Sequence, residues 1–389
     1  MIDREELRQL AELDITPAAA VTFYFQPQRP QNKSHREEAI LVKDLVRDAL
    51  RNAEREGANP ALRGDLERIL ALAEQLHGNH ARAKAVFACG AKGIWREFDL
   101  PARLQATRLI VNSRFHLAPL ALLMDSSERR TCVALIDRER ARILDLFLGQ
   151  VSERAAILDS TPRRVKSDGW GGYEAGRRER HVDNEAMRHY KSVLEQLQAQ
   201  ALAGAFDLLA IGCHGENRPE IEPHLPTSLK QRLLGWFVTD PTIATADAVR
   251  DEAERMLEER RQSEQEALVR EVIGEASRNG RGSLGLKHVL NSLERGEIQR
   301  LLLGEHFAAT VTECANCGHL DTRMVRSCAV CGQATREVPD VTDALVARTV
   351  RDGVQLVHIR GDEEFERAGN IGALLRFRAD QNTAQKIAG

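Results

Sequence analysis

The sequence lacks a long apolar run. None approaches the roughly 20 consecutive residues that a membrane-spanning helix needs, and the longest, Leu117–Met124, is broken by Pro119. The first residues, Met1–Glu6, are mostly charged, which is not the pattern of a secretory signal. We therefore expect a cytoplasmic protein with no membrane partner.

The sequence also lacks a large net charge of either sign. The net charge of −3 and the pI of about 6.5 argue against a protein that coats nucleic acid generally. There is no Walker A sequence, so the chain is not a P-loop NTPase. Residues 280–285 match G-x-G-x-x-G but follow an expected helix, which favours a linker over a dinucleotide site. Cys213 and His214 have no third residue that would complete a catalytic triad.

Cysteine is scarce, and its spacing is informative. Three of the seven cysteines lie singly in apolar stretches, and we interpret them as buried thiols: Cys89, Cys132 and Cys213. The other four form C-x2-C-x10-C-x2-C: Cys314, Cys317, Cys328 and Cys331. In a reducing cytosol this spacing favours a metal site over disulfides. Each pair is closed by a glycine, so the set predicts one structural zinc ion in a tetrahedral site with no open position for water.

The length of 389 residues exceeds one ordinary hydrophobic core, so several domains are expected. Strands that alternate with helices predict α/β layers in the later part of the chain. We predict an α/β protein of three domains: a mixed α+β domain (1–127), a middle domain (128–280) and a C-terminal domain (281–389) with a zinc-binding insertion (313–336). The acidic run Asp362–Glu366 is expected to be a solvated loop.

A polar, glycine-rich segment, residues 161–180, lies within the middle domain. Its glycines let the backbone approach another molecule closely, its bases can neutralise phosphates, and its aromatic rings can stack on bases. This composition favours insertion into RNA over a surface loop without a ligand. The residues expected to contact RNA are Arg163, Arg164, Lys166, Trp170, Gly171, Gly172, Tyr173, Arg177, Arg178 and Arg180. Asp183 is expected to cap the helix that follows.

Four stretches carry a resemblance to a known family: Cys132–Ile143, Asp168–His181, Gly285–Leu302 and Gly361–Leu375. The first resembles the hairpin that opens the middle domain of the archaeal and eukaryotic class-one peptide chain release factors and their relative Pelota. The second occupies the place of that family's catalytic Gly-Gly-Gln loop. The last two look like signatures of its C-terminal domain, and the zinc knuckles lie where archaeal members carry theirs. The chain resembles the bacterial members more closely, among them a ribosome hibernation factor.

The resemblance implies a ribonuclease H-like middle domain and a C-terminal α/β/α sandwich. It also implies ribosomal RNA as a partner, near the tRNA entry site and the peptidyl-transferase centre, and a translational GTPase as an escort. One departure matters: Gly171-Gly172 is followed by Tyr173 instead of glutamine. The family's glutamine places a water at the ester of peptidyl-tRNA, whereas tyrosine is longer, rigid and lacks the amide. We therefore assign no catalytic residue and do not expect peptide release.

We expect a non-catalytic factor that occupies the tRNA entry site of idle or stalled ribosomes, in hibernation or a stalling response. Two alternatives stay open. One is a peptidyl-tRNA hydrolase for ribosome rescue that tolerates Tyr173. The other is a zinc-ribbon adaptor that binds RNA or protein away from the ribosome.

Overall fold

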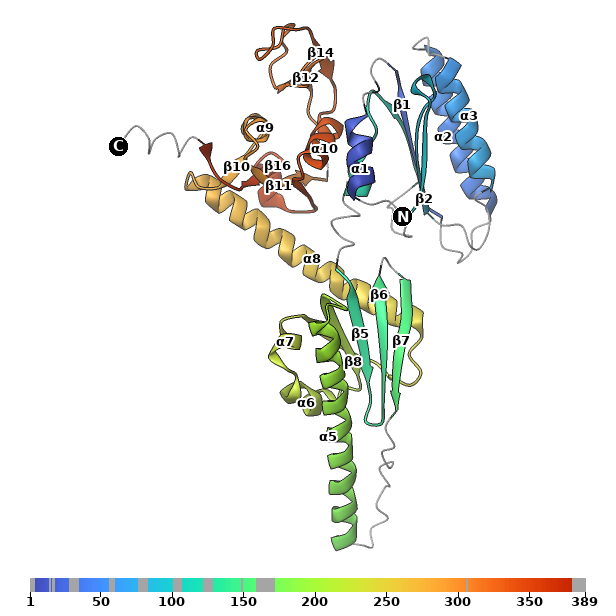
Figure 1. Cartoon of the computed structure of the whole chain (residues 1–389), viewed down its shortest axis with the longest axis vertical. Coiled ribbons are helices and arrows are strands. Elements are labelled where there is room, and N and C mark those ends of the chain that lie inside the picture. Colours follow the sequence, from blue (N-terminus) through green and yellow to red (C-terminus); the bar gives the residue numbers. More distant parts are fainter. Residues whose placement is uncertain are drawn as a thin grey trace, which may run out of the picture. The chain divides into compact units, whose positions relative to one another are not determined.

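The chain forms two compact units, one of residues 127–263 and the other of residues 1–126 and 264–389 (Figure 1). The computed structural model describes residues 4–13, 15, 18–27, 35–55, 60–75, 83–100, 107–121, 129–147, 150–158, 172–305 and 307–379. In these ranges no helix combines the length and the apolar character that crossing a membrane requires.

The unit of residues 127–263 is built on a five-stranded sheet in the order β7-β6-β5-β8-β9. Its strands are β5 (Thr131–Ile136), β6 (Arg140–Phe147), β7 (Gln150–Leu158), β8 (Leu208–Cys213) and β9 (Leu233–Val238). β5, β6 and β7 pair antiparallel, and β5, β8 and β9 run parallel. The helices are α5 (Gly172–Leu202), α6 (Arg218–Ile221), η2 (Glu222–His224), α7 (Thr227–Lys230) and the first part of α8 (Ala246–Ser277). This order agrees with the ribonuclease H-like domain that the resemblance implies.

Side-chain alternation along β5 explains why both faces of this sheet are covered. Cys132, Ala134 and Ile136 share a core with α5, α6 and α7. Val133 and Leu135 point the other way, into a core with α8. A central strand buried on both faces is apolar at nearly every position, as the run of β5 is.

Residues 1–126 form an antiparallel sheet in the order β3-β2-β1-β4. The strands are β1 (Ala20–Phe25), β2 (Ala83–Cys89), β3 (Ile94–Leu100) and β4 (Arg108–Asn112). The helices are α1 (Arg4–Glu12), α2 (His35–Arg55), α3 (Pro60–Gln75) and the 3-10 turn η1 (Gly90–Lys92). Val21, Phe23 and Phe25 of β1 face α2 and α3, whereas Tyr24 belongs to the core that includes α1.

Residues 282–375 contain a four-stranded sheet in the order β10-β16-β11-β15. Its strands are β10 (Gly282–Leu284), β11 (Ile298–Gly304), β15 (Gln355–Ile359) and β16 (Ile371–Leu375), and its helices are α9 (Leu286–Glu294), α10 (Thr342–Arg351) and α11 (Glu363–Arg367). Leu301 and Leu303 share a core with α9 and α10, while Leu302 packs with α8 and α11. Helices therefore cover both faces, which confirms the α/β/α sandwich. The expectation of a loop at Asp362–Glu366 is wrong, because Glu363–Glu366 belong to α11 and Asp362 caps that helix.

A small three-stranded sheet is inserted between β11 and α10. It has the order β13-β12-β14, from β12 (Val311–Cys314), β13 (Leu320–Asp321) and β14 (Thr335–Val338), all antiparallel. This insertion, which carries the four spaced cysteines, is called the ribbon below.

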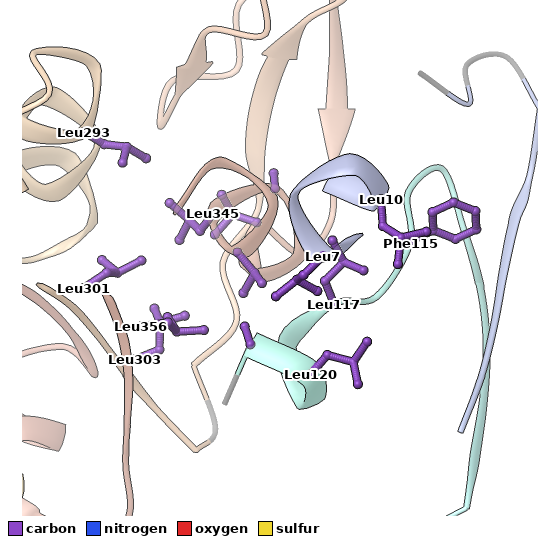
Figure 2. Close-up of a cluster of buried hydrophobic side chains, with 14 of the residues drawn as sticks. Leu7, Leu10, Phe115, Leu117, Leu120, Leu293, Leu301, Leu303, Leu345 and Leu356 are labelled. Atoms are coloured by element: carbon purple, nitrogen blue, oxygen red, sulfur yellow. The ribbon is translucent and has the colours of Figure 1, made fainter. Parts of the chain in front are cut away.

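The two ends of the chain share one hydrophobic core (Figure 2). Leu7 and Leu10 of α1 belong to the same cluster as Leu345 of α10. Polar contacts reinforce this joint: His116 Nδ1 lies 2.6 Å from Asp343 Oδ1, and Asn112 donates to Asp343 at 3.1 Å. The expected boundaries between three domains stay predictions. Residues 1–126 and 264–389 together form one compact unit.

Candidate functional site

The four ribbon cysteines are brought together by two matching turns. In the first, the backbone N–H of Gly318 donates to the carbonyl of Cys314 at 3.1 Å. In the second, the N–H of Gly332 donates to the carbonyl of Cys328 at 2.9 Å. Both glycines have positive φ, 69° and 74°, a conformation that side-chain-bearing residues rarely adopt. The glycine after each cysteine pair is therefore needed for the turn that aims both sulfurs at one point.

The sulfur atoms of this set fit a tetrahedral metal ion. The four Sγ atoms all lie within 4.8 Å of one another, with Cys314 and Cys331 3.4 Å apart and Cys317 and Cys328 3.6 Å apart. Metal–sulfur bonds of about 2.3 Å in a tetrahedron place sulfurs roughly 3.8 Å apart. The residues present therefore form a site that can hold one metal ion.

Backbone N–H groups also affect the pKa of the cysteine thiols at this site. The N–H groups of Cys317 and Asn316 both point at the sulfur of Cys314 at 3.4 Å, and the first of these lowers the pKa of the Cys314 thiol to about 6. For Cys317 the N–H of His319 also favours the thiolate, yet burial and the neighbouring thiols raise its pKa to about 12. The thiolate of Cys314 thus forms easily, whereas a thiolate of Cys317 beside it is favoured only by a positive ion.

Charged side chains hold the base of the ribbon. Glu313, only 5% exposed, accepts hydrogen bonds from Arg114 on one carboxylate oxygen and from Arg336 on the other, the latter at 2.8 Å. His319 contacts Glu294 of α9. These contacts tie the metal-binding turns to the sandwich and to the N-terminal segment.

The glycine-rich segment falls largely outside the described residues. Arg163, Arg164, Lys166, Trp170 and Gly171 lie there. The expectation of a loop up to residue 180 is wrong, because α5 begins at Gly172 and residues 172–180 are helical. This stretch holds the remaining expected RNA-contacting residues: Gly172, Tyr173, Arg177, Arg178 and Arg180.

A polar cluster lies where α5 meets the sheet. Arg138, in the β5–β6 turn, contacts Asp183 of α5 and lies 3.4 Å from Glu220 of α6. Asp183 is therefore inside α5 and bound to Arg138, and its expected role as a helix cap is wrong. Tyr190, fully buried beside this cluster, has its pKa raised by burial and by the negative charge of Glu220. The cluster fixes α5 over the sheet.

The three isolated cysteines are buried, as predicted. Burial raises the pKa of Cys213 to about 11 and that of Cys132 to about 12, so neither is a ready nucleophile. His214, next to Cys213, lies 3.8 Å from Asp240. This arrangement supports the interpretation of a core cysteine beside a turn histidine.

The glycines of residues 280–285 serve packing. A Cβ on Gly282 would lie 2.2 Å from the carbonyl oxygen of Val272, so β10 can pass this close to α8 only with glycine there. Gly285 has a φ of 81° at the start of α9. The linker interpretation of this motif agrees with these roles.

Residues 116–258 match the family described as bacterial archaeo-eukaryotic release factor family 10. The match spans the five-stranded sheet and α5, and it confirms the resemblance to the release-factor family for this part of the chain. No curated protein sequence is similar enough to the chain to count as a match.

Several solved structures are similar over much of the chain. An archaeal translation termination factor has 15% identity and a TM-score of 0.25, with 97% of this chain and 99% of that chain covered. Pelota from Archaeoglobus fulgidus has 14% identity and a TM-score of 0.37, with 78% and 81% covered. A ribosome-bound archaeal Pelota has 14% identity and a TM-score of 0.40, with 97% and 94% covered. These scores are too low to establish a shared overall fold.

Proposed function

We propose that this protein is a ribosome-binding translation factor that occupies the tRNA entry site of idle or stalled ribosomes. The observation that carries the proposal is the match of residues 116–258 to a release-factor family. The resemblance to the archaeal and eukaryotic release factors implies that the corresponding loop works at the peptidyl-transferase centre. A factor that binds ribosomes works in the cytoplasm.

The geometry of α5 supports this role. The helix begins at Gly172, and from Asp183 onward Ala186 is its first residue in the core of its unit. At 1.5 Å per residue, the turns of α5 between Gly172 and Ala186 are about 20 Å long. Arg177, Arg178 and Arg180 lie on these turns. A basic segment on a rigid arm suits insertion into a narrow RNA-lined channel.

We infer that the factor blocks this site without releasing peptide. Tyr173 stands where the family has its glutamine, and the only polar atom of tyrosine lies at the far end of a ring. Trp170 and Tyr173 would stack or fill space, and the arginines would contact ribosomal RNA phosphates. A translational GTPase would deliver the factor, as the resemblance implies.

We infer further that the ribbon holds zinc. Four thiolates in a closed tetrahedral set are the donors typical of structural zinc. The ion would fix the two cysteine turns and take no part in chemistry, because all four of its positions would be filled by sulfur.

Sedimentation through a sucrose cushion tests the proposal. The protein should pellet with purified bacterial ribosomes and be displaced by excess aminoacyl-tRNA bound at the entry site. A protein that stays in the supernatant at low salt would favour the adaptor that acts off the ribosome. Binding accompanied by rapid peptide release would favour the hydrolase.

A further inference from the structure

A small charged hollow lies at the base of the ribbon, and none of the four cysteines lines it. Its volume is about 20 Å³, and its walls include Arg114, Arg348, Arg351, Glu294 and Glu313. A space of this size holds one or two water-sized groups. It can therefore accept one or two oxygens of an anion at its mouth, but not a whole organic ligand.

The acidic side chains of this hollow already have partners. Glu313 uses both carboxylate oxygens, one for Arg114 and one for Arg336. Glu294 contacts His319 through Oε1. Glu313 thus serves Arg114 and Arg336, and Glu294 serves His319, so neither carboxylate forms a hydrogen bond with Arg348 or Arg351 in the described ranges.

The cations of α10 are less completely paired. Ala344, Arg348 and Arg351 follow one another at spacings of four and three, so they share one face of the helix, and all line the hollow. Arg348 donates through Nε to Asp352 at 2.8 Å. The side chain of Arg351 has no hydrogen bond or ion pair with any residue in the described ranges.

Electrostatics point the same way. Burial, and after it the positive charge of Arg348, lower the pKa of Arg351; Arg114 adds to this effect, and the negative charges of Asp352 and Glu313 partly offset it. Arginines near a helix C-terminus also interact with the helix dipole, which explains a cation at either position alone. It does not explain why three arginines line one hollow, where Glu313 pairs with Arg114 and Asp352 with Arg348, but no carboxylate in the described ranges forms an ion pair with Arg351.

We propose that Arg348, Arg351 and Arg114 bind a phosphate group, carried by an RNA backbone or free in solution. A guanidinium offers parallel N–H donors that match two oxygens of a phosphate, and two such groups can hold one phosphate at the mouth of a narrow hollow. The site uses no residue of the glycine-rich segment and none of the four cysteines, so it does not rest on the proposed function.

Binding of inorganic phosphate is the first test. Melting temperatures of the full chain are measured with increasing phosphate at constant ionic strength, against chloride. The variants are Arg351→Gln, Arg348→Gln and the control Arg360→Gln, an exposed arginine that does not line the hollow. A ligand that binds the folded state raises the melting temperature in proportion to its affinity.

We expect phosphate to stabilise the wild type and Arg360→Gln alike. In Arg351→Gln and Arg348→Gln the apparent affinity should fall about tenfold or more, because each loses a charged hydrogen-bond donor. Arg351→Lys keeps the positive charge but loses the parallel N–H donors of the guanidinium, so its phosphate affinity should be intermediate. Equal stabilisation of all variants, or no advantage of phosphate over chloride for the wild type, would overturn the site. If either glutamine variant fails to fold in chloride, the other one carries the test.

Salt dependence then identifies the source of the phosphate. The probe is a fluorescent single-stranded RNA of mixed sequence. If the site takes a backbone phosphate, Arg351→Gln should flatten the slope of log affinity against log salt by about 0.7, the effect of one phosphate that is no longer bound, while Arg360→Gln should not. An unchanged slope in a variant that no longer responds to inorganic phosphate would assign the site to free phosphate.

Discussion

Tyr173 decides between two functions. One is a factor that occupies the site without releasing peptide, called the plug below, and the other is a peptidyl-tRNA hydrolase. Hydrolysis of peptidyl-tRNA needs a group that orients a water at the ester, and displacing such a group by about 1 Å can reduce the rate by two orders of magnitude. The hydroxyl of tyrosine lies well beyond the reach of a glutamine amide. The loop should therefore occupy the site without activating water.

We predict that the wild type binds ribosomes and leaves peptidyl-tRNA intact, and that Tyr173→Gln gives at most weak release. Trp170 precedes the glycine pair and Glu174 follows Tyr173, so one substitution does not rebuild an active loop. The measurement is liberation of labelled peptide from loaded ribosomes. Tyr173→Phe is the matched control and should behave as the wild type. Rapid release by the wild type would contradict the plug.

The arginines at the start of α5 should contribute through charge. Replacing Arg177, Arg178 and Arg180 with alanine should weaken ribosome binding and flatten its salt dependence, by about 0.7 to 0.9 in the log–log slope for each phosphate that the variant no longer binds. The control removes three exposed bases from α2 and α3: Arg47, Arg51 and Arg63. If both triple variants give the same slope as the wild type, the arginines of α5 do not contact phosphate.

At the scale of elements, the ribbon depends on its metal. Its strands are short, two to four residues each, and its cysteine turns have little apolar surface to hold them. Binding of a structural metal then supplies much of the folding free energy. The ribbon should lose order without the metal, while the α/β/α sandwich, which has its own cores, should not.

We predict about one zinc ion per chain by elemental analysis, because four thiolates fill one tetrahedral site. A strong chelator should remove it and abolish hydrogen-exchange protection of β12 and β14, with the sheet of β10, β11, β15 and β16 still protected. Cys328→Ser should lose zinc, whereas Cys213→Ala, which alters a buried thiol elsewhere, should keep it. Metal-free protein with an unchanged ribbon would contradict the assignment.

The elements that sequence patterns predict are those with local signals. The cysteine spacing and the apolar runs of β5 and β8 are such signals, and the structure agrees with them. The start of α5 is not such a signal, because residues 172–180 are mostly glycines and charged residues, so their sequence shows no apolar helix face. β3 also lacks such a signal, since Arg96, Glu97 and Asp99 make this edge strand resemble a loop.

Sites assembled from distant residues could not be predicted. Arg114 precedes Arg348 by more than half of the chain, and only the fold brings them to one hollow. The contact of Asp183 with Arg138 is of the same kind: as a sequence, Asp183 before an apolar helical pattern looks like a cap. Sequence motifs therefore predict local chemistry. Contacts between residues far apart in the chain depend on the tertiary structure, and sequence motifs do not predict them.

At the scale of the whole molecule, residues 1–126 and 264–389 should unfold together, because they share one core. Leu345→Ala in α10, at a fully buried position, should lower the free energy of unfolding by about 2 to 5 kcal/mol. Hydrogen exchange should then speed up in α1 as well as in α10. Ile40→Ala, at a 56% exposed position on α2, is the control and should change stability by less than about 0.5 kcal/mol. Loss of protection confined to α10 would show that the two segments unfold separately.

The shared core also sets an order for folding during synthesis. The ribosome completes residues 1–126 first, but α1 and its side of the N-terminal sheet belong to a core whose other half begins only after residue 263. Elongation proceeds at about 5 to 20 residues per second, so the synthesis of residues 127–263 takes roughly 7 to 27 seconds. During this time the apolar face of the N-terminal sheet is not covered by its partner segment. The intervening unit, which has its own cores, can fold in that interval. A nascent chain of this protein is thus exposed to chaperones, and to misassociation with neighbouring chains, through its N-terminal sheet.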